Sequence, residues 1–311
     1  MFKDIDINSK SELEPYFKLV DYEASEYCFS TIYMWRHLFN TKCYIENDFA
    51  IILLEYEKNV FSMIPLCKKD KLLYVIDFAL NYIKNEYKRI QLKGVNEEIA
   101  DIIKINYKEK FIYEKERDLF EYIYDAESLR TLSGRKNKKK RNHVNTFLNL
   151  YKNRYEYKLL DKENFEECIK LLNVWEQNKE NIESSGHKEL DEEILSIKEV
   201  FENYEKLKGN VKIAGVYIDN KLEAFTIGEK INENIALIHI EKANQNIKGI
   251  YQYINQQFLL NEFPNVKYVN REEDLGLDGL REAKLSYHPC KFIEKYSIKE
   301  AHNKEVKLTS F

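Results

Sequence analysis

Long apolar runs are absent from this chain of 311 residues. Nowhere do about 18 apolar residues follow one another, so we expect no transmembrane segment, although peripheral contact with a membrane stays open. Glycine (9) and proline (4) are scarce, which argues against collagen-like and disordered classes. The first ten residues hold no apolar signal-peptide core, and this favours a cytoplasmic location.

Cysteine is also sparse. The five cysteines are scattered without a Cys-x-x-Cys pair, which indicates reduced thiols in a cytoplasm. Around His239 no third metal ligand has convincing spacing, so we expect no zinc site and no other metal.

The most prominent feature present is a basic block. The net charge is 49 − 53 = −4, yet six of the seven residues from Arg135 to Arg141 are positive. Such a density causes self-repulsion, and an anionic partner (CoA, tRNA or a lipid head group) would explain it. A solvated loop of like charges is the alternative, and the lack of interleaved aromatic residues disfavours a dedicated single-strand nucleic-acid platform. The phosphate-binding candidates in the block are Arg135, Lys136, Lys139, Lys140, Arg141 and His143.

Hydrophobic spacing predicts a helix over residues 138–151. Its buried stripe would consist of Val144, Phe147, Leu148 and Tyr151. Lys140 and Arg141 continue the same stripe one to two turns earlier. Because a buried unpaired cation is very unfavourable, that end of the stripe must open onto a polar cleft or a partner anion.

Strand and helix patterns alternate in the same order, β-β-β-α-β-α-β, in both halves of the chain. We therefore predict an α+β fold (α/β mixed sheets) with two domains, 1–125 and 126–311, the second preceded by a basic segment at 130–158. In the first half we expect strands at 43–46, 49–56, 60–64, 90–93, near 111 and at 119–124, and helices at 71–85 and 97–105. In the second half we expect strands at 211–218, 222–229, 235–241, 266–269 and 291–298, and helices from 247 and at 277–287. Further helices are expected at 25–37, from 165 to 175 and at 189–205.

A second candidate site lies where the third strand of the second half runs into a helix. Simple alternation places His239 and Glu241 on one face of the strand, where either could orient a substrate or move protons. A hydrogen-bonded core or edge histidine is the alternative. Free N–H groups at the following helix start suit phosphate, and a glycine lets the backbone approach a ligand closely. The donor-binding candidates here are Asn244, Asn246, Lys248, Gly249 and Tyr251.

A third polar segment, 270–276, follows the short strand at 266–269, and ligands often lie at the carboxyl ends of strands in such sheets. Glu272 joins His239 and Glu241 as a candidate general base. Arg281, Lys284 and His288 would line one face of the next helix, although a solvated face is the alternative. The substrate-cleft candidates are Gln252, Asn255, Asn270, Arg271, Asp274, Arg281 and Lys284.

Seven segments together carry a family resemblance: Ser133–Lys136, Lys139–His143, His239–Asn244, Lys248–Gln252, Asn270–Gly276, Leu280–Lys284 and Ser286–Pro289. The chain resembles, over nearly its whole length, bacterial proteins similar to the C-terminal catalytic domain of phosphatidylglycerol lysyltransferase. The resemblance implies two tandem domains of the acyl-CoA N-acyltransferase (GNAT) fold, as in Fem-type peptidoglycan aminoacyltransferases. It also implies transfer of an acyl or aminoacyl group to an amine or hydroxyl.

In that picture the segment 244–249 corresponds to the donor loop of a GNAT domain. Ordinary acetyltransferases carry (Gln/Arg)-x-x-Gly-x-(Gly/Ala) there, and residues 246–251 depart from this at the first and last positions. Tyr251 is far bulkier than glycine or alanine, so aminoacyl-tRNA becomes as good a donor candidate as acyl-CoA, and the basic block would suit its phosphates. The lysyltransferases carry many transmembrane helices ahead of this domain, whereas we expect none in this chain. The resemblance therefore does not by itself imply a lipid acceptor. A non-catalytic module that binds tRNA or anionic lipid, and an interaction or scaffold protein, are the alternatives.

Overall fold

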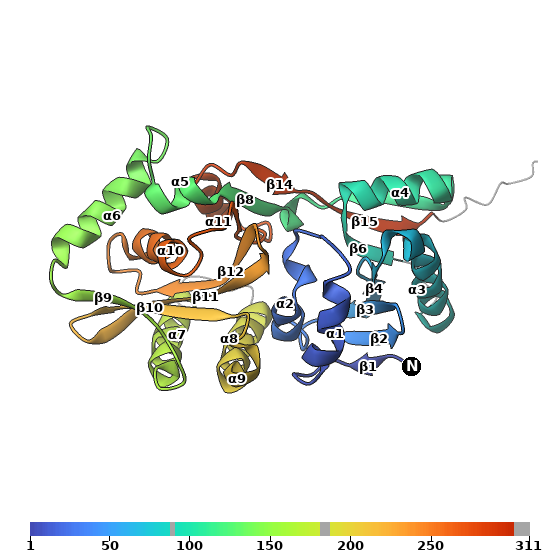
Figure 1. Ribbon diagram of the computed structural model, residues 1–311, viewed down its shortest axis with the longest axis horizontal. Coiled ribbons are helices and arrows are strands. Elements are labelled where there is room, and N and C mark those ends of the chain that lie inside the picture. Colours follow the sequence, from blue (N-terminus) through green and yellow to red (C-terminus); the bar gives the residue numbers. More distant parts are fainter. Residues whose placement is uncertain (88–90, 181–186, 302–311) are drawn as a thin grey trace, which may run out of the picture. The chain divides into compact units, whose positions relative to one another are not determined.

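The computed structural model describes residues 1–87, 91–180 and 187–301 (Figure 1). Backbone contacts divide them into two units. The first unit comprises Met1–Asp21, Phe39–Leu119 and the segment from Glu294, and the second comprises Tyr22–Leu38 and Phe120–Ile293. Neither unit is continuous in sequence, which differs from the single boundary at 125/126 expected from the linear order of elements.

The first unit is built on a mixed sheet in the order β1-β2-β3-β4-β6-β15-β7, with β5 paired to β3. Its strands are β1 (Lys3–Asp4), β2 (Lys42–Glu46), β3 (Phe49–Tyr56), β4 (Asn59–Ser62), β5 (Leu66–Cys67), β6 (Gln91–Asn96), β7 (Phe111–Lys115) and β15 (Lys295–Glu300). Its helices are α1 (Ser9–Phe17), α3 (Leu72–Tyr87) and α4 (Glu97–Tyr107), with short 3-10 turns at Lys69–Lys71, Lys108–Lys110 and Arg117–Leu119. The buried residues of α3 recur at helical spacing, which is why the sequence predicts a helix in this segment.

The second unit is built on a mixed sheet in the order β14-β8-β13-β12-β11-β10-β9. Its strands are β8 (Glu121–Asp125), β9 (Tyr155–Leu159), β10 (Lys212–Ile218), β11 (Lys221–Asn232), β12 (Ile235–Ala243), β13 (Tyr268–Asn270) and β14 (Lys291–Ile293). Its helices are α2 (Phe29–Met34), α5 (Ala126–Thr131), α6 (Lys138–Leu150), α7 (Phe165–Glu180), α8 (His187–Glu202), α9 (Tyr204–Leu207), α10 (Ile250–Asn261) and α11 (Asp278–Leu285), with a 3-10 turn at Ser25–Tyr27.

The α+β class with mixed sheets is confirmed, but the final strand of each half lies in the other half's sheet. β8 was expected to close the first sheet, and it pairs instead with β13 and β14 of the second. The strand expected at 291–298 splits into β14 and β15, and β15 pairs with β6 and β7 of the first sheet. Periodicity along a strand says which residues are buried but not which sheet receives the strand.

Most other predicted elements form close to their expected bounds. The Asp219–Asn220 turn joins β10 to β11, with φ of 49° and 65° at its two central residues, as a two-residue hairpin of the primed type requires. The helix expected at 25–37 is wrong in length, since only a 3-10 turn and the short α2 form there. The start of the strand expected at 90–93 lies partly outside the described residues.

Helices cover both faces of the second sheet. In Figure 1, α10 lies on one face of β10, β11 and β12, while α7 and α8 lie on the other. The α10 face carries an apolar core that includes Val144 and Phe147 of α6 and Ile254 of α10. None of the helices formed by the described residues combines the length and the apolar character that crossing a membrane requires.

Candidate functional site

The helix α6, which carries part of the basic block, is in direct contact with Gly249 of the donor loop. Gly249 has φ +85°, and a Cβ added there would lie 2.1 Å from the backbone oxygen of His143 and 3.2 Å from Cβ of Phe147. Only glycine therefore allows α6 to pack its backbone against the start of α10. Gly249 thus permits the close approach of another helix, whereas the sequence predicted the close approach of a ligand.

This packing gathers cations from two segments around one histidine. Burial and the positive charges of Lys140, Lys139 and Lys248 together lower the pKa of His143. Lys139 and Lys140 come from α6, whereas Lys248 belongs to the loop before α10. The basic block and the donor loop therefore share one electrostatic environment.

Lys140 is the half-buried member of this group. Its Nζ lies 3.9 Å from the ring centroid of Tyr287, which is a cation–π contact. Burial, together with the charges of Arg271 and Lys139, lowers the pKa of Lys140 to about 8, against the pull of Glu241. Lys140 is therefore partly buried beside an aromatic ring and other charged groups, and the polar cleft or partner anion expected at this end of the stripe stays a prediction.

Arg271 continues the cationic group from the segment after β13. Its guanidinium lies 4.8 Å from the ring centroid of Tyr287, and its Nη2 lies 3.4 Å from a carboxylate oxygen of Glu241. Burial disfavours its charge, but Glu241, Tyr287 and Tyr124 together outweigh burial and raise the pKa of Arg271. Within the described part of the chain, the buried Nη1 of Arg271 has no hydrogen-bond partner. Such an atom is a candidate contact for a ligand.

Glu241 lies beyond the point where the pairing of two parallel strands ends. β12 pairs with β13 from Ile235–Leu237 to Tyr268–Asn270, and β12 continues past this point to Ala243. Glu241 belongs to this unpaired continuation of β12, and Arg271 follows directly after β13. The Glu241 carboxylate also accepts a hydrogen bond of 3.0 Å from Asn255 of α10. The carboxyl ends of parallel strands are the usual ligand position in such sheets.

Two further side chains complete this group, which we call the Lys140–Arg271 cluster, comprising Lys140, Arg271, Glu241, Gln252 and Tyr287. Gln252 and Arg271 hydrogen-bond to the Tyr287 hydroxyl, and burial raises the pKa of Tyr287 to about 12. The phenol therefore stays protonated at neutral pH. Tyr287 was not a site candidate from sequence, although it lies within a segment that carried the family resemblance.

The prediction that His239 and Glu241 share a face is wrong. Ile227 pairs with Ile240 and Gly228 pairs with Ile238, so His239 is the extra residue of a β-bulge. The bulge interrupts alternation and turns His239 toward the face opposite Glu241. Thr226 donates a hydrogen bond of 2.9 Å to the Ile240 carbonyl at this irregularity.

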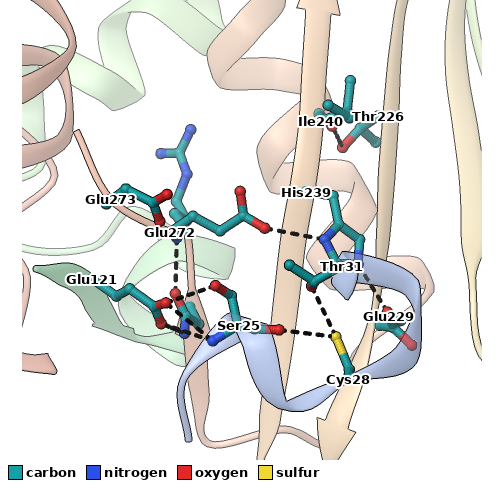
Figure 2. Close-up of polar contacts among 12 residues, drawn as sticks. Ser25, Cys28, Thr31, Glu121, Thr226, Glu229, His239, Ile240, Glu272 and Glu273 are labelled. Atoms are coloured by element: carbon teal, nitrogen blue, oxygen red, sulfur yellow. Dashed lines mark hydrogen bonds and ion pairs between the residues drawn. The ribbon is translucent and has the colours of Figure 1, made fainter. Parts of the chain in front are cut away.

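His239 lies between two carboxylates (Figure 2). Its Nε2 is 2.9 Å from Glu229 and its Nδ1 is 3.1 Å from Glu272, and its side chain is 1% exposed. Burial opposes the charge, but the hydrogen bonds to both carboxylates outweigh burial and raise the pKa of His239 to about 9. A histidine that holds its proton at neutral pH is a weak proton acceptor, which counts against His239 as the general base.

Cys28 reaches the same cluster from the segment Tyr22–Leu38. Its thiol lies 3.1 Å from the Thr31 hydroxyl and 3.2 Å from the Ser25 carbonyl, and Figure 2 shows it beside Glu229 and His239. Burial and the neighbouring Glu229 raise the pKa of Cys28 well above its usual value. Neither Cys28 nor Glu229 was a candidate from sequence, because about 200 residues separate them and no spacing rule connects them.

Several basic-block and loop candidates stabilise the backbone locally. Arg141 donates to the carbonyls of Leu132 and Gly134, which ties the loop ahead of α6 to the helix. The Asn244 side chain donates to Glu223 at 2.8 Å and accepts from the N–H of Asn246 at 3.1 Å. These contacts give Arg141 and Asn244 a structural role.

Tyr251 closes the donor loop. Its hydroxyl donates to the Ala243 carbonyl at 3.2 Å and accepts from the Ala243 N–H at 3.3 Å. Tyr251, the sixth residue of the 246–251 motif, therefore fixes the end of β12 to the start of α10.

The segment after β13 is held by buried polar contacts. Asn270 donates to the fully buried Glu121, which also accepts from the N–H and hydroxyl of Ser25. Asp274 accepts from Tyr122 and, at 2.8 and 2.9 Å, from Arg281. These donors, opposed by burial, hold the pKa of Asp274 well below its usual range.

Lys284 is buried on α11 and donates to the carbonyls of Arg271 and Glu273. Burial lowers its pKa to about 8. Lys284 therefore fixes the loop that presents Arg271. The candidates whose residues are exposed are Arg135, Lys136, Lys139, Asn246 and Lys248.

Comparison with known proteins adds a family and a fold. Residues 17–299 match the family model described as phosphatidylglycerol lysyltransferase, C-terminal. A conserved protein of unknown function from Bacteroides thetaiotaomicron is 30% identical, with a TM-score of 0.89 over 96% of this chain and 99% of that chain. The L-PGS structure from Bacillus licheniformis is 15% identical, with a TM-score of 0.66 over 93% of this chain and 91% of that chain. A tandem GNAT protein from the clavulanic acid biosynthesis pathway is 10% identical, with a TM-score of 0.52 over 97% of this chain and 99% of that chain. The expected tandem GNAT fold is therefore confirmed.

One curated relative matches part of the chain. It is an uncharacterized protein of Mycoplasmoides gallisepticum, 25% identical over 197 residues, which make up 63% of this chain. The matched region spans about 60% of that relative's length.

Proposed function

Because the chain belongs to the family of phosphatidylglycerol lysyltransferase C-terminal domains, we propose that it transfers an aminoacyl group from aminoacyl-tRNA to an amine or hydroxyl acceptor. Family and fold are those of GNAT-like acyltransferases of the lysyltransferase type. The donor, the acceptor and the catalytic residues given below are our proposal.

The observation that carries the donor assignment is the packing of α6 on Gly249. In our proposal the helix backbone fills the space beside this glycine, which disfavours a pyrophosphate seated there as in acetyl-CoA enzymes. The same packing brings Lys139, Lys140 and Lys248 together. Several cations from two segments suit the repeated phosphates of a nucleic acid, whose binding scales with the number of phosphates neutralised.

The reacting ester would lie at the carboxyl ends of β12 and β13. Arg271, with one buried nitrogen unpartnered among the described residues, would donate to the carbonyl oxygen as negative charge develops on it. Glu241, held by Asn255, would accept the proton of the attacking amine or hydroxyl. The acceptor's nitrogen or oxygen forms the new bond to the carbonyl carbon, the ester C–O bond breaks, and the tRNA ribose oxygen leaves as a hydroxyl with the proton that Glu241 accepted.

The test is single-turnover transfer from labelled aminoacyl-tRNA, with phosphatidylglycerol vesicles and hydroxylamine as separate acceptor arms. We expect the chain to bind aminoacyl-tRNA with strong salt dependence and to accelerate loss of the label to one acceptor. Glu241→Gln should reduce the rate by about 100-fold or more while leaving tRNA binding intact. Glu233→Gln is the matched control, because the Glu233 side chain is 93% exposed and has no part in the proposed site.

Three outcomes distinguish the alternatives. Salt-dependent tRNA binding without transfer to either acceptor would favour the non-catalytic binding module. Thermal stabilisation by acyl-CoA with no tRNA binding would overturn the donor assignment. An undiminished rate in Glu241→Gln would reject Glu241 as the base.

A further inference from the structure

The buried cluster of Cys28, Glu229 and His239 has a chemistry that aminoacyl transfer does not use. We propose that these three side chains bind a divalent metal ion of the zinc class. Thiolate sulfur, imidazole nitrogen and carboxylate oxygen are the three ligand types that Zn²⁺ takes in proteins. The proposal can be tested without the transfer reaction.

The spacing of the three ligand atoms suits one ion. The Cys28 sulfur, a His239 nitrogen and a Glu229 oxygen all lie within 4.8 Å of one another, and His239 Nε2 is 2.9 Å from Glu229. Bonds of about 2.0 to 2.3 Å in a tetrahedron place ligand atoms roughly 3.3 to 3.7 Å apart. Small shifts of the side chains would therefore bring all three atoms to bonding distance.

The other nitrogen of His239 already has the partner that a metal-bound histidine needs. Nδ1 is 3.1 Å from the Glu272 carboxylate, which leaves Nε2 facing Glu229 (Figure 2). A carboxylate on the far nitrogen fixes the ring and its tautomer and makes the ligating nitrogen more basic. Glu272 would thus act as a positioning residue for the metal ligand.

Metal binding would displace protons from the ligands. With the ion bound, Cys28 is a thiolate and Nε2 of His239 offers its lone pair, so binding releases protons and strengthens as pH rises. The Thr31 hydroxyl, 3.1 Å from the Cys28 sulfur, offers a fourth ligand atom, or a water takes that place.

Metal binding would connect three separate parts of the second unit. Cys28 belongs to the segment Tyr22–Leu38, while Glu229 and His239 belong to β11 and β12. Through Glu272, the ion would also fix the segment that presents Arg271. Its expected role is therefore to hold this segment against the sheet.

The experiment uses the full chain, stripped of metal with a chelator and titrated with Co²⁺ or Zn²⁺ alone. We expect one ion per chain, and for Co²⁺ a thiolate-to-metal charge-transfer band together with the visible bands of a tetrahedral site. Cys28→Ser should abolish the charge-transfer band. Cys290→Ser is the matched control, because Cys290 is exposed and lies outside the cluster.

Two further variants keep the test informative if Cys28→Ser folds poorly. Glu229→Gln should reduce the binding stoichiometry or affinity without removing the thiol. Glu272→Gln should weaken binding by about 10- to 100-fold while the charge-transfer band keeps its position. Circular dichroism of each metal-free variant separates loss of the site from loss of the fold.

The proposal is overturned if the metal-free chain binds no Co²⁺, or if the charge-transfer band survives Cys28→Ser. It is equally overturned if Zn²⁺ binds with the same affinity in Glu229→Gln and in wild type. In those cases the cluster is a buried histidine held between two carboxylates.

Discussion

Replacing Gly249 by alanine tests the helix packing on which the proposed anion site at Lys139, Lys140 and Lys248 (the shared anion site) depends. The new Cβ would lie 2.1 Å from the His143 backbone oxygen and 3.2 Å from Phe147, and the backbone at Gly249 has φ +85°. A non-glycine residue in this left-handed region costs about 1 to 2 kcal/mol. Moving α6 away from α10 adds a packing penalty of about 1 to 3 kcal/mol. Gly249→Ala should therefore lower the free energy of unfolding of the second unit by about 2 to 5 kcal/mol.

Two other glycines of the same unit separate the two contributions. Gly134 has φ +79° but nothing within 4 Å of an added Cβ, so Gly134→Ala should show the backbone penalty alone. Gly279 has neither constraint and lies within α11, so Gly279→Ala should be neutral or stabilising by up to about 1 kcal/mol.

Urea unfolding followed by tryptophan fluorescence is the appropriate assay. Both tryptophans, Trp35 and Trp175, belong to the second unit, so the signal reports on that unit. A loss of stability in Gly249→Ala no greater than that in Gly134→Ala would refute the close packing of α6 on the donor loop. Weakened tRNA binding in Gly249→Ala alone would link this packing to the proposed ligand.

Three further predictions follow from charge. Lys140→Met should stabilise the ligand-free chain at pH 7, because the folded-state pKa of Lys140, about 8, lies below the usual value of about 10.4. The charged lysine therefore destabilises the folded wild type below pH 8, and this destabilisation fades as pH rises toward about 10.4. Urea unfolding of wild type and variant at several pH values would detect the difference. Asp274→Asn should lower the free energy of unfolding by about 3 kcal/mol at pH 7. It should also remove part of the acid instability of wild type below about pH 4, because the depressed pKa of Asp274 contributes stability that is lost as pH falls, and unchanged acid unfolding would contradict this. Lys139→Ala and Lys248→Ala should each reduce the salt slope of tRNA binding by about 1 while leaving the thermal midpoint unchanged, and equal slopes for wild type and variants would count against a shared site.

Much of the fold could be predicted from local pattern. The strands β3 and β12 and the helices α3, α6 and α10 form close to where alternation and helical spacing place them. The partners of β8 and β15 could not be predicted, because a strand's burial pattern is the same in either sheet. Only the backbone contacts of the folded units separate the two possibilities.

The candidate site was predictable where charge marks it and unpredictable where irregular backbone or distant segments form it. The charge density at Lys139 and Lys140 identified α6 directly. The side of the sheet that His239 faces depends on one bulge residue, which a strict period of 2 cannot anticipate. Cys28 joins Glu229 only because the chain folds a distant segment onto the second sheet.

The most direct test of the shared anion site is lysine-reactivity footprinting with and without aminoacyl-tRNA. The account predicts that Lys139, Lys140 and Lys248 become protected together, at the same tRNA concentration and with the same salt dependence. Exposed lysines of the first unit, such as Lys69, should stay reactive. Protection of the α6 lysines while Lys248 remains fully reactive, or protection of none of the three, would contradict it.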